Sequence, residues 1–297
     1  MGPWGFGLTP LEGSAPPEFG VAAFESRPLF PSQTWTACHP PEGDAPASCA
    51  DAASVWTDVW FTNHIAQAVI GAALVIGFWL VVTRRPAVVP GKRQFLGEYA
   101  YNLIRNGVAR DIVGPGFEKY VPYLLALFSF ILVNNLFGQT FLFMFPTFSK
   151  IGFAWGLAIA SWVLYNAAGV KKHGFVKYFS NMTMPHGVPK PLLLLVAPLE
   201  FISNFVTRPL TLGLRLFANL FAGHLVVMVF VVGGSWLLLS TPHSSGGYSP
   251  IWNVAGGLAI LMSFFVFAIE LLVACLQAYI FTVLTAQYVS SSLAEEH

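Results

Sequence analysis

Two charged side chains stand isolated in long apolar segments near the C-terminal end of the chain. Between Arg208 and Glu295 the only formally charged residues are Arg215 and Glu270. A guanidinium stays protonated at any physiological pH, and placing it near the middle of a bilayer costs about 2.5–3.5 kcal/mol on insertion scales. A chain that only had to span lipid would carry leucine there. The pattern therefore indicates an ion or proton pathway, with Arg215 as its fixed charge.

The segment around Arg215 places polar and small residues on one side of a helix. Arg215 and Asn219 are four positions apart and therefore share a face of an ideal helix. Small residues let another helix approach the backbone closely, so this surface is suited to helix contact. His224 lies nine positions after Arg215, about 180° around the helix, and is expected to face the interior of this protein. The small residues are Gly213, Ala218, Ala222 and Gly223.

A polar stripe runs along the last apolar segment. Glu270, Gln277, Phe281 and Tyr288 lie at positions i, i+7, i+11 and i+18, which fall within about 20° of one line on a helix. Burial in lipid disfavours the charged form of a carboxyl group, which then takes up and releases protons near neutral pH. The stripe therefore indicates a route for protons along this helix.

Each of these residues also has a purely structural interpretation. Arg215 and Glu270 could form a buried salt bridge that holds two helices together, although such a pair contributes little to stability. Gln277 could form an interhelical hydrogen bond, and His224 could be an ordinary packing histidine. Tyr288 lies near the end of its segment, where tyrosine commonly anchors a helix at the membrane surface. The combined polarity exceeds what a structural lock requires, which favours the pathway.

The composition places the chain among membrane proteins. Of its 297 residues, 55% are hydrophobic and 10% are charged, whereas a soluble domain carries roughly 25% charged residues. We predict an all-α integral membrane fold, since about 20 helical residues span the hydrocarbon core. The last two of its five crossings are long enough to require strong tilting or kinking. The predicted crossings are residues 61–82, 121–143, 151–170, 193–239 and 251–292.

Basic residues predict how the chain is oriented in the membrane. Short loops rich in Lys and Arg stay in the cytoplasm, and such loops follow the first and third predicted crossings. The N-terminus is therefore expected outside and the C-terminus in the cytoplasm. The basic residues concerned are Arg84, Arg85, Lys92, Arg93, Lys171, Lys172 and Lys177.

Two regions outside the crossings differ in composition from the rest. Residues 92–110 mix apolar side chains with Arg and Glu at helical spacing, which predicts an amphipathic helix on the cytoplasmic surface; a cytosolic linker helix is the alternative.

Residues 1–58, rich in Pro, Gly and acids, are expected to form an irregular external segment before a membrane domain of residues 59–297. On an oxidising face Cys38 and Cys49 could form a disulfide; two free thiols are the alternative.

Several other kinds of chemistry lack sequence support. The chain has no phosphate-binding loop, no H-E-x-x-H motif and no nucleophile elbow, and its seven histidines show no metal-ligand spacing. No metal or cofactor is therefore expected.

A secondary transporter that binds a small anion at Arg215 is a rival interpretation, but it would have repeated halves and broken helices. An intramembrane enzyme would need a nucleophile–base pair or a metal cluster.

Two segments, in this order, resemble the signatures of a known family. Residues 212–224 read LGLRLFANLFAGH and residues 270–288 read ELLVACLQAYIFTVLTAQY. They resemble the signatures of subunit a of F-type ATP synthases, the first of which surrounds an essential arginine. The resemblance covers residues 60–297 and looks like the actinobacterial form. Further matches are VPGKRQFLGEYAYNLIR, EKYVPYLLALF and the terminal SSLAEEH.

The resemblance implies a stator subunit that carries protons past a rotating ring of c subunits. Two aqueous half-channels would lead to the ring, with Arg215 between them as the essential charge. The chemistry of ATP would belong to other subunits, so no catalytic reaction, bound nucleotide or nucleic acid is expected on this chain.

The resemblance also implies partners and a location. The implied partners are the c-subunit ring, b-type peripheral stalk subunits and the lipid bilayer. The implied location is a bacterial plasma membrane, with the mitochondrial inner membrane as the alternative. The choice between protons and sodium ions stays open because it depends on the ring.

The same resemblance assigns residues to the proton path. His224 and Glu270 stand where other members hold an acid and a histidine, so the pair is exchanged here, and both would belong to the half-channel open to the outside. Asn135 matches an Asn of the second crossing. Glu200 stands near the family's acid of the cytoplasmic half-channel, but one residue further from Arg215 than in some relatives. The complete expected path is Asn219, His224, Glu270, Gln277, Tyr288, Asn135, Glu200 and Ser203.

Overall fold

A computed structural model describes residues 63–84, 89, 91–140, 147–183, 190–239 and 250–294. These residues form two compact units. The hairpin unit contains residues 221–239 and 250–273, and the main unit contains the other described residues. The predicted external segment, with Cys38 and Cys49, lies outside the described residues.

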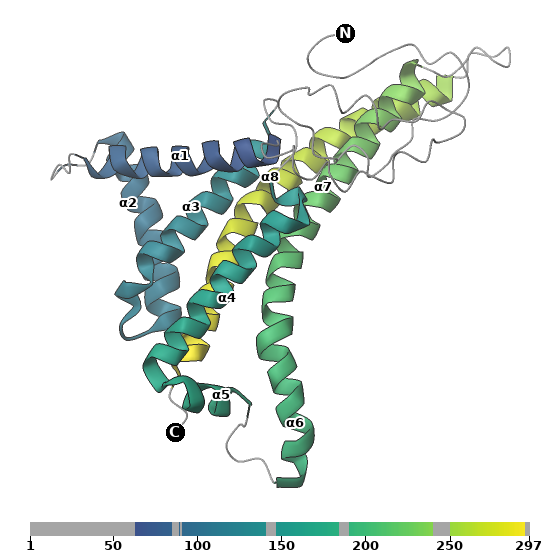
Figure 1. Cartoon of the computed structure of the whole chain (residues 1–297). Helices are drawn as coiled ribbons and strands as arrows, with labels where there is room; N and C mark the ends of the chain where they lie inside the picture. The colour runs from purple at the N-terminus through teal and green to yellow at the C-terminus, as the bar shows by residue number, and fades with distance from the viewer. Residues whose placement is uncertain are drawn as a thin grey trace, which may run out of the picture. The chain divides into compact units, whose positions relative to one another are not determined.

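The described residues are helical apart from short turns, and none of them forms a strand. Helices satisfy every backbone polar group within one segment, which lipid requires. Figure 1 shows their arrangement within each unit. In chain order they are α1 Asn63–Thr83, α2 Lys92–Ile104, the π-helix η4 Arg105–Val113, η5 Phe117–Lys119, α3 Val121–Gly138, η6 Thr147–Ser149, α4 Ile151–His173, α5 Phe175–Thr183, α6 Lys190–Ile202, the π-helix η7 Ser203–Thr207, α7 Arg208–Leu239 and α8 Pro250–Leu293.

Five helical segments of the described chain are long and apolar enough to cross a membrane. They correspond in order to the five predicted crossings, so the all-helical membrane fold is confirmed. The fourth crossing differs in one respect, because the π-helix η7 interrupts it between α6 and α7. Single π-helical turns are rare and often occur at functional sites. The tilt of the last two crossings stays a prediction.

The predicted amphipathic segment forms α2, which continues directly into the π-helix η4. Gly97 packs closely on α1, because a Cβ there would lie 2.4 Å from Cγ1 of Val82. Another side of α2 exposes Phe95, Leu96 and Tyr99, each by about 60%. A helix therefore forms as expected, while its position at the membrane surface stays a prediction.

The core of the main unit lies where α3 and α4 pack with the parts of α7 and α8 that belong to this unit. Figure 1 shows α4 beside the C-terminal part of α8, where the rings of Tyr165 and Tyr288 are in contact. Gly213 brings α7 close to α4, because a Cβ there would lie 3.3 Å from Cβ of Ala158. This glycine, expected to help another helix approach, thus serves the chain's own packing. Fully buried core residues include Leu124, Ile131, Tyr165, Leu216 and Phe281.

The hairpin unit depends on two glycines that face each other. A Cβ on Gly234 would lie 3.1 Å from the carbonyl oxygen of Gly256, and a Cβ on Gly256 would lie 2.9 Å from that of Gly234. Glycine allows two helical backbones to approach this closely. The two helices of this unit therefore pair backbone to backbone at these positions.

Candidate functional site

Arg215 lies on α7 in the main unit, with its side chain exposed. Leu212 and Leu216 on the same helix are buried in the core, which directs Arg215 to a different side. Within the described part of the chain, its guanidinium makes no hydrogen bond and no ion pair. The residues of this site therefore leave the cation without a counter-charge.

The exposed side of α7 near Arg215 carries mostly short side chains. Thr211, Ala218 and Asn219 are exposed there, and Leu214 is 39% exposed. Short side chains leave room for another helix to approach closely. Arg215 thus lies on an exposed surface of α7 that it shares with Thr211, Ala218, Asn219 and Leu214.

Asn219 connects α7 to α8 through a direct contact between two side-chain amides. Its Nδ2 donates a hydrogen bond to Oε1 of Gln277 at 2.8 Å. Gln277 is only 2% exposed, and its Nε2 has no partner among the described residues. Gln277 thus takes part in a hydrogen bond between helices, as its structural interpretation allowed, but as the acceptor. Its amide nitrogen has no partner among the described residues, and its place on the proton path stays a prediction.

Asn135 connects α3 to α8 one turn away from Gln277. Its Nδ2 donates to the carbonyl oxygen of Ala274 at 3.0 Å. Its Oδ1 is buried and has no partner among the described residues. A buried polar atom without a partner is costly, and an ordered water or an ion commonly explains it. Asn135 and Gln277 therefore provide an open acceptor and an open donor in this part of the main unit.

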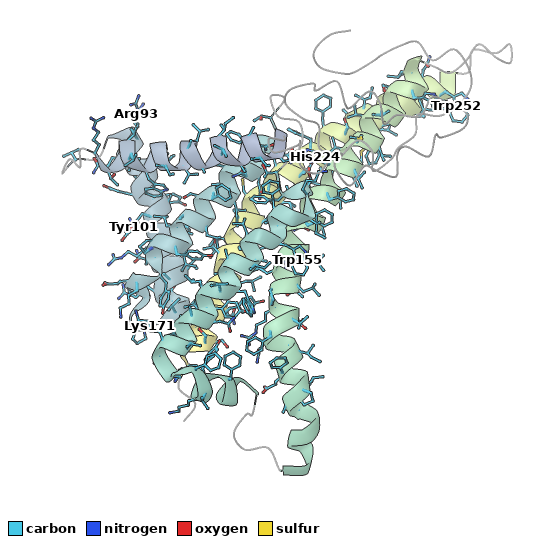
Figure 2. The ribbon with its side chains drawn as sticks, viewed as in Figure 1. Arg93, Tyr101, Trp155, Lys171, His224 and Trp252 are labelled. Carbon is cyan, nitrogen blue, oxygen red and sulfur yellow. The ribbon has the colours of Figure 1, made fainter. Side chains whose placement is uncertain are left out.

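Glu270 and His224 form a close pair inside the hairpin unit. Nδ1 of His224 lies 2.5 Å from Oε1 of Glu270, and the two side chains are 13% and 5% exposed. Gly223 provides the space, because a Cβ there would lie 2.9 Å from Oε1 of Glu270. Within the hairpin unit the partner of Glu270 is thus His224. Figure 2 labels His224 on its helix.

Comparison with known proteins identifies the family of this chain. The family model of the ATP synthase A chain matches residues 65–290. The chain belongs to the ATP synthase A chain family. Membership identifies a membrane-sector component of ATP synthase, the complex that links proton transport to ATP synthesis.

Similar proteins named ATP synthase subunit a come from actinobacteria. The one from a Nocardioides species is 48% identical over 236 residues, covering 80% of this chain and 83% of the relative. The one from Pseudarthrobacter chlorophenolicus is 43% identical, covering 80% and 87%. The one from Frankia alni is 39% identical, covering 80% of each. The predicted resemblance to the actinobacterial form is confirmed.

Tyr288, which the resemblance to this family places on the proton path, is engaged through its ring. The Cζ atom of Arg208 lies 5.2 Å from the ring centroid, and the ring of Tyr165 lies 5.6 Å away on centroids. Within the described residues the hydroxyl of Tyr288 has no hydrogen-bond partner. These contacts fix the position of the ring, while the assignment of Tyr288 to the proton path stays a prediction.

The two residues expected on the cytoplasmic path lie where α6 ends and the π-helix η7 begins. Glu200 is half-buried on α6, and Ser203 is exposed as the first residue of η7. Within the described residues, neither side chain forms a hydrogen bond or ion pair with the site residues above. Their assignment to the path stays a prediction.

Sequence reasoning missed Arg208, whose guanidinium contacts Tyr288. Its charge also reaches α5, where burial raises the pKa of Tyr178 to about 12 although the nearby Arg208 opposes the shift. The phenol of Tyr178 therefore stays protonated and donates to Oδ1 of Asn166 at 3.0 Å. The sequence did contain a clue to this residue, because Arg208 lies seven residues before Arg215 and therefore on the same face of the helix.

A second buried polar group, also missed, lies where α1 and α3 meet η6 in the main unit. The hydroxyl of Thr147 donates to Oδ1 of Asn134 at 3.2 Å. His64 and Gln67 on α1 are buried, and each has a polar nitrogen without a partner among the described residues. The sequence could have indicated this group, because His64 and Gln67 are polar residues in an apolar helix. Positions that face lipid rarely carry such residues.

Proposed function

We propose that this chain is the proton-translocating stator subunit of an ATP synthase, with Arg215 as the fixed charge between two half-channels that lead to a ring of c subunits. The observation that carries the proposal is the exposed guanidinium of Arg215, which the described chain leaves without a counter-charge. A permanent cation in an apolar helix requires a partner. Family membership supports a partner within the same complex.

The electrostatics of such a partner produce directed proton release. A carboxyl group on a moving ring has to be neutral while it faces lipid, because exposing its charge there is very costly. When it meets Arg215, the opposite charge favours ionisation, and the proton leaves into one half-channel. After the carboxylate passes Arg215 it is reprotonated from the other half-channel.

The same charge prevents a direct leak. A proton that moved straight from one half-channel to the other would approach the guanidinium, and like charges repel strongly where the dielectric constant is low. The short exposed side chains near Arg215 support this arrangement, since they let a ring helix come close. Arg215 would thus be both an ionising group and a barrier.

Protons need titratable or hydrogen-bonding groups on either side of the ring. We assign the outer half-channel to His224 and Glu270, whose close contact suits transfer of a proton between carboxyl and imidazole. The unpartnered amide atoms of Asn135 and Gln277 offer sites for water in the main unit. Glu200 and Ser203 are assigned to the cytoplasmic half-channel.

We also propose an orientation and a set of partners. The positions of the basic residues along the sequence favour an N-terminus outside and a C-terminus in the cytoplasm. The actinobacterial relatives support a bacterial plasma membrane. A b-type peripheral stalk would hold the subunit still while the ring turns.

Replacement of Arg215 in the complete complex tests the proposal. The variant Arg215→Ala, reconstituted in vesicles with all partner subunits, should lose ATP-driven proton pumping, since removal of one preorganised charge commonly costs about 10²–10³ in rate. Arg93→Ala on α2, an exposed arginine outside the site, is the matched control and should pump normally. Normal pumping by Arg215→Ala would falsify the assignment.

A further inference from the structure

Two polar contacts join α7 to α8 in the main unit at matching spacing. The amide contact joins Asn219 and Gln277, and the arginine–tyrosine contact joins Arg208 and Tyr288. Eleven residues separate the two contacts on α7, and eleven separate them on α8. Eleven residues make about three helical turns, so each helix presents both of its contact residues on one face. The two contacts therefore specify a single register between the helices.

The arginine–tyrosine contact holds the last turns of α8 through two kinds of interaction. The guanidinium of Arg208 faces the ring of Tyr288, with Cζ 5.2 Å from the centroid, which is within the range of cation–π attraction. Its Nη1 also donates to Oγ of Ser291 at 3.4 Å. Arg208 thus engages two residues three positions apart on the same side of α8.

The ring of Tyr288 also contacts α4. Tyr165 on α4 is fully buried and contacts this ring, with an interplanar angle of 60°. The hydroxyl of Tyr165 donates to the carbonyl oxygen of Asn204 at 3.3 Å, in the π-helix η7 just before Arg208. In addition, Nζ of Lys172 donates to the carbonyl oxygen of Leu293 at 2.8 Å. The end of α8 is therefore attached both to the start of α7 and to α4.

We infer that Arg208 is a positioning residue, which acts through Tyr288 to keep Arg215 at one height and one rotation against α8. This inference rests on the proposed function, because it concerns the presentation of Arg215 to the ring. Arg215 is seven residues after Arg208 and four before Asn219, so it lies between the two contacts. The residue of α8 in the corresponding register is Phe281, which is buried and carries no charge.

The consequence for Arg215 follows from helix geometry. Core packing of Leu212 and Leu216 limits the rotation of α7. With the amide contact as its polar attachment to α8, however, the helix keeps more freedom to turn or slide, and each residue of slippage turns a helix by about 100°. Such a rotation would move the guanidinium away from the exposed small-residue surface. The second contact, three turns away, removes that freedom while Phe281 offers no competing anion.

Four variants of the complete, reconstituted ATP synthase test the inference. Arg208→Gln and Tyr288→Leu each remove the cation–π contact, and we expect ATP-driven pumping to fall about threefold to tenfold in both, the range such a contact supports. Arg208→Lys and Tyr288→Phe keep a cation and a ring, and should retain at least about half of the pumping rate. Arg93→Gln is the matched control and should match the unmodified complex.

Two further readouts separate positioning from proton transfer and from general stability. Residual pumping in the Arg208→Gln and Tyr288→Leu variants should keep its pH profile, because a residue that only positions Arg215 exchanges no protons; a shifted profile in Tyr288→Leu would instead indicate proton transfer by Tyr288. Combining the two changes should cost no more than the larger single effect, because both remove one contact. Equal loss in Tyr288→Phe and Tyr288→Leu would show that the hydroxyl matters and would overturn the inference, as would fully additive losses.

The variants also distinguish this inference from the proposed function. If Arg208→Gln pumps normally while Arg215→Ala is inactive, the positioning role is wrong and the stator assignment stands. If Arg215→Ala pumps normally, the stator assignment itself fails. Should Arg208→Gln prevent assembly, the comparison of Tyr288→Phe with Tyr288→Leu decides, since only the ring contact differs between them.

Discussion

The surface around Arg215 and the pair in the hairpin unit handle charge in opposite ways. Glu270 is buried, and the chain supplies its partner, His224, at 2.5 Å. Arg215 is exposed, and the described residues of the site supply it with none. Under the proposed function, the charge that the described chain leaves unpaired would interact with a group on another molecule. In this molecule, burial of the carboxyl group goes with a partner from the same unit, whereas the exposed guanidinium has no such partner among the described residues.

The largest effect is expected when leucine replaces Arg215, because the unpaired charge is then lost. We expect Arg215→Leu to abolish pumping yet to favour membrane insertion of the subunit by about 3 kcal/mol, because arginine is costly and leucine favourable on insertion scales. Pumping in vesicles and the inserted fraction in a translocation assay measure the two effects. A purely structural arginine would give the same gain in insertion but unchanged coupling.

Changes to the buried pair should slow transport without abolishing it. We expect Glu270→Gln and His224→Ala each to reduce the pumping rate by about tenfold, corresponding to one charge-assisted hydrogen bond. The double variant should be little slower than either single one, since the two residues act together. Rates equal to those of the unmodified complex in both single variants would remove the pair from the path.

A single methyl group should disturb the pair indirectly. In Gly223→Ala the new Cβ would lie 2.9 Å from Oε1 of Glu270, so the carboxyl has to move, and we expect pumping to fall about threefold because the hydrogen bond to His224 weakens. Gly257→Ala is the matched control in the same unit, because its Cβ meets nothing within 4 Å. Equal rates for the two glycine variants would show that the close pair does not limit transport.

The smallest effect is expected at the amide contact beside Arg215. Asn219→Ala removes one hydrogen bond, worth about 1 kcal/mol, and leaves both side-chain polar atoms of Gln277 unpartnered among the described residues. We expect about a twofold loss of pumping and a lower midpoint of thermal unfolding. A change to Gln277→Leu in the same background should add little; independent losses would mean that the two amides do not work as a pair.

Much of the fold follows from local properties of the chain. The apolar lengths of α1, α3 and α4 predict their ends to within five residues, because the thickness of the bilayer sets how long such helices are. The isolation of Arg215 and Glu270 is visible in the sequence alone. Helical periodicity also placed Asn219 beside Arg215 and turned His224 the other way, and the structure agrees in leaving Arg215 exposed and His224 largely buried.

What the sequence could not decide is which residue meets which across helices. Glu270 pairs with His224 in the space that Gly223 provides, and Arg208 contacts Tyr288. In each case the residues in contact are at least 46 positions apart in the sequence. Such contacts depend on helix register and rotation, and a shift of one residue, about 100°, would exchange all partners. Periodicity shows which face a residue occupies on its own helix. Only the packed structure determines what lies opposite that face, and hence that Glu270 is paired while Arg215 is left free.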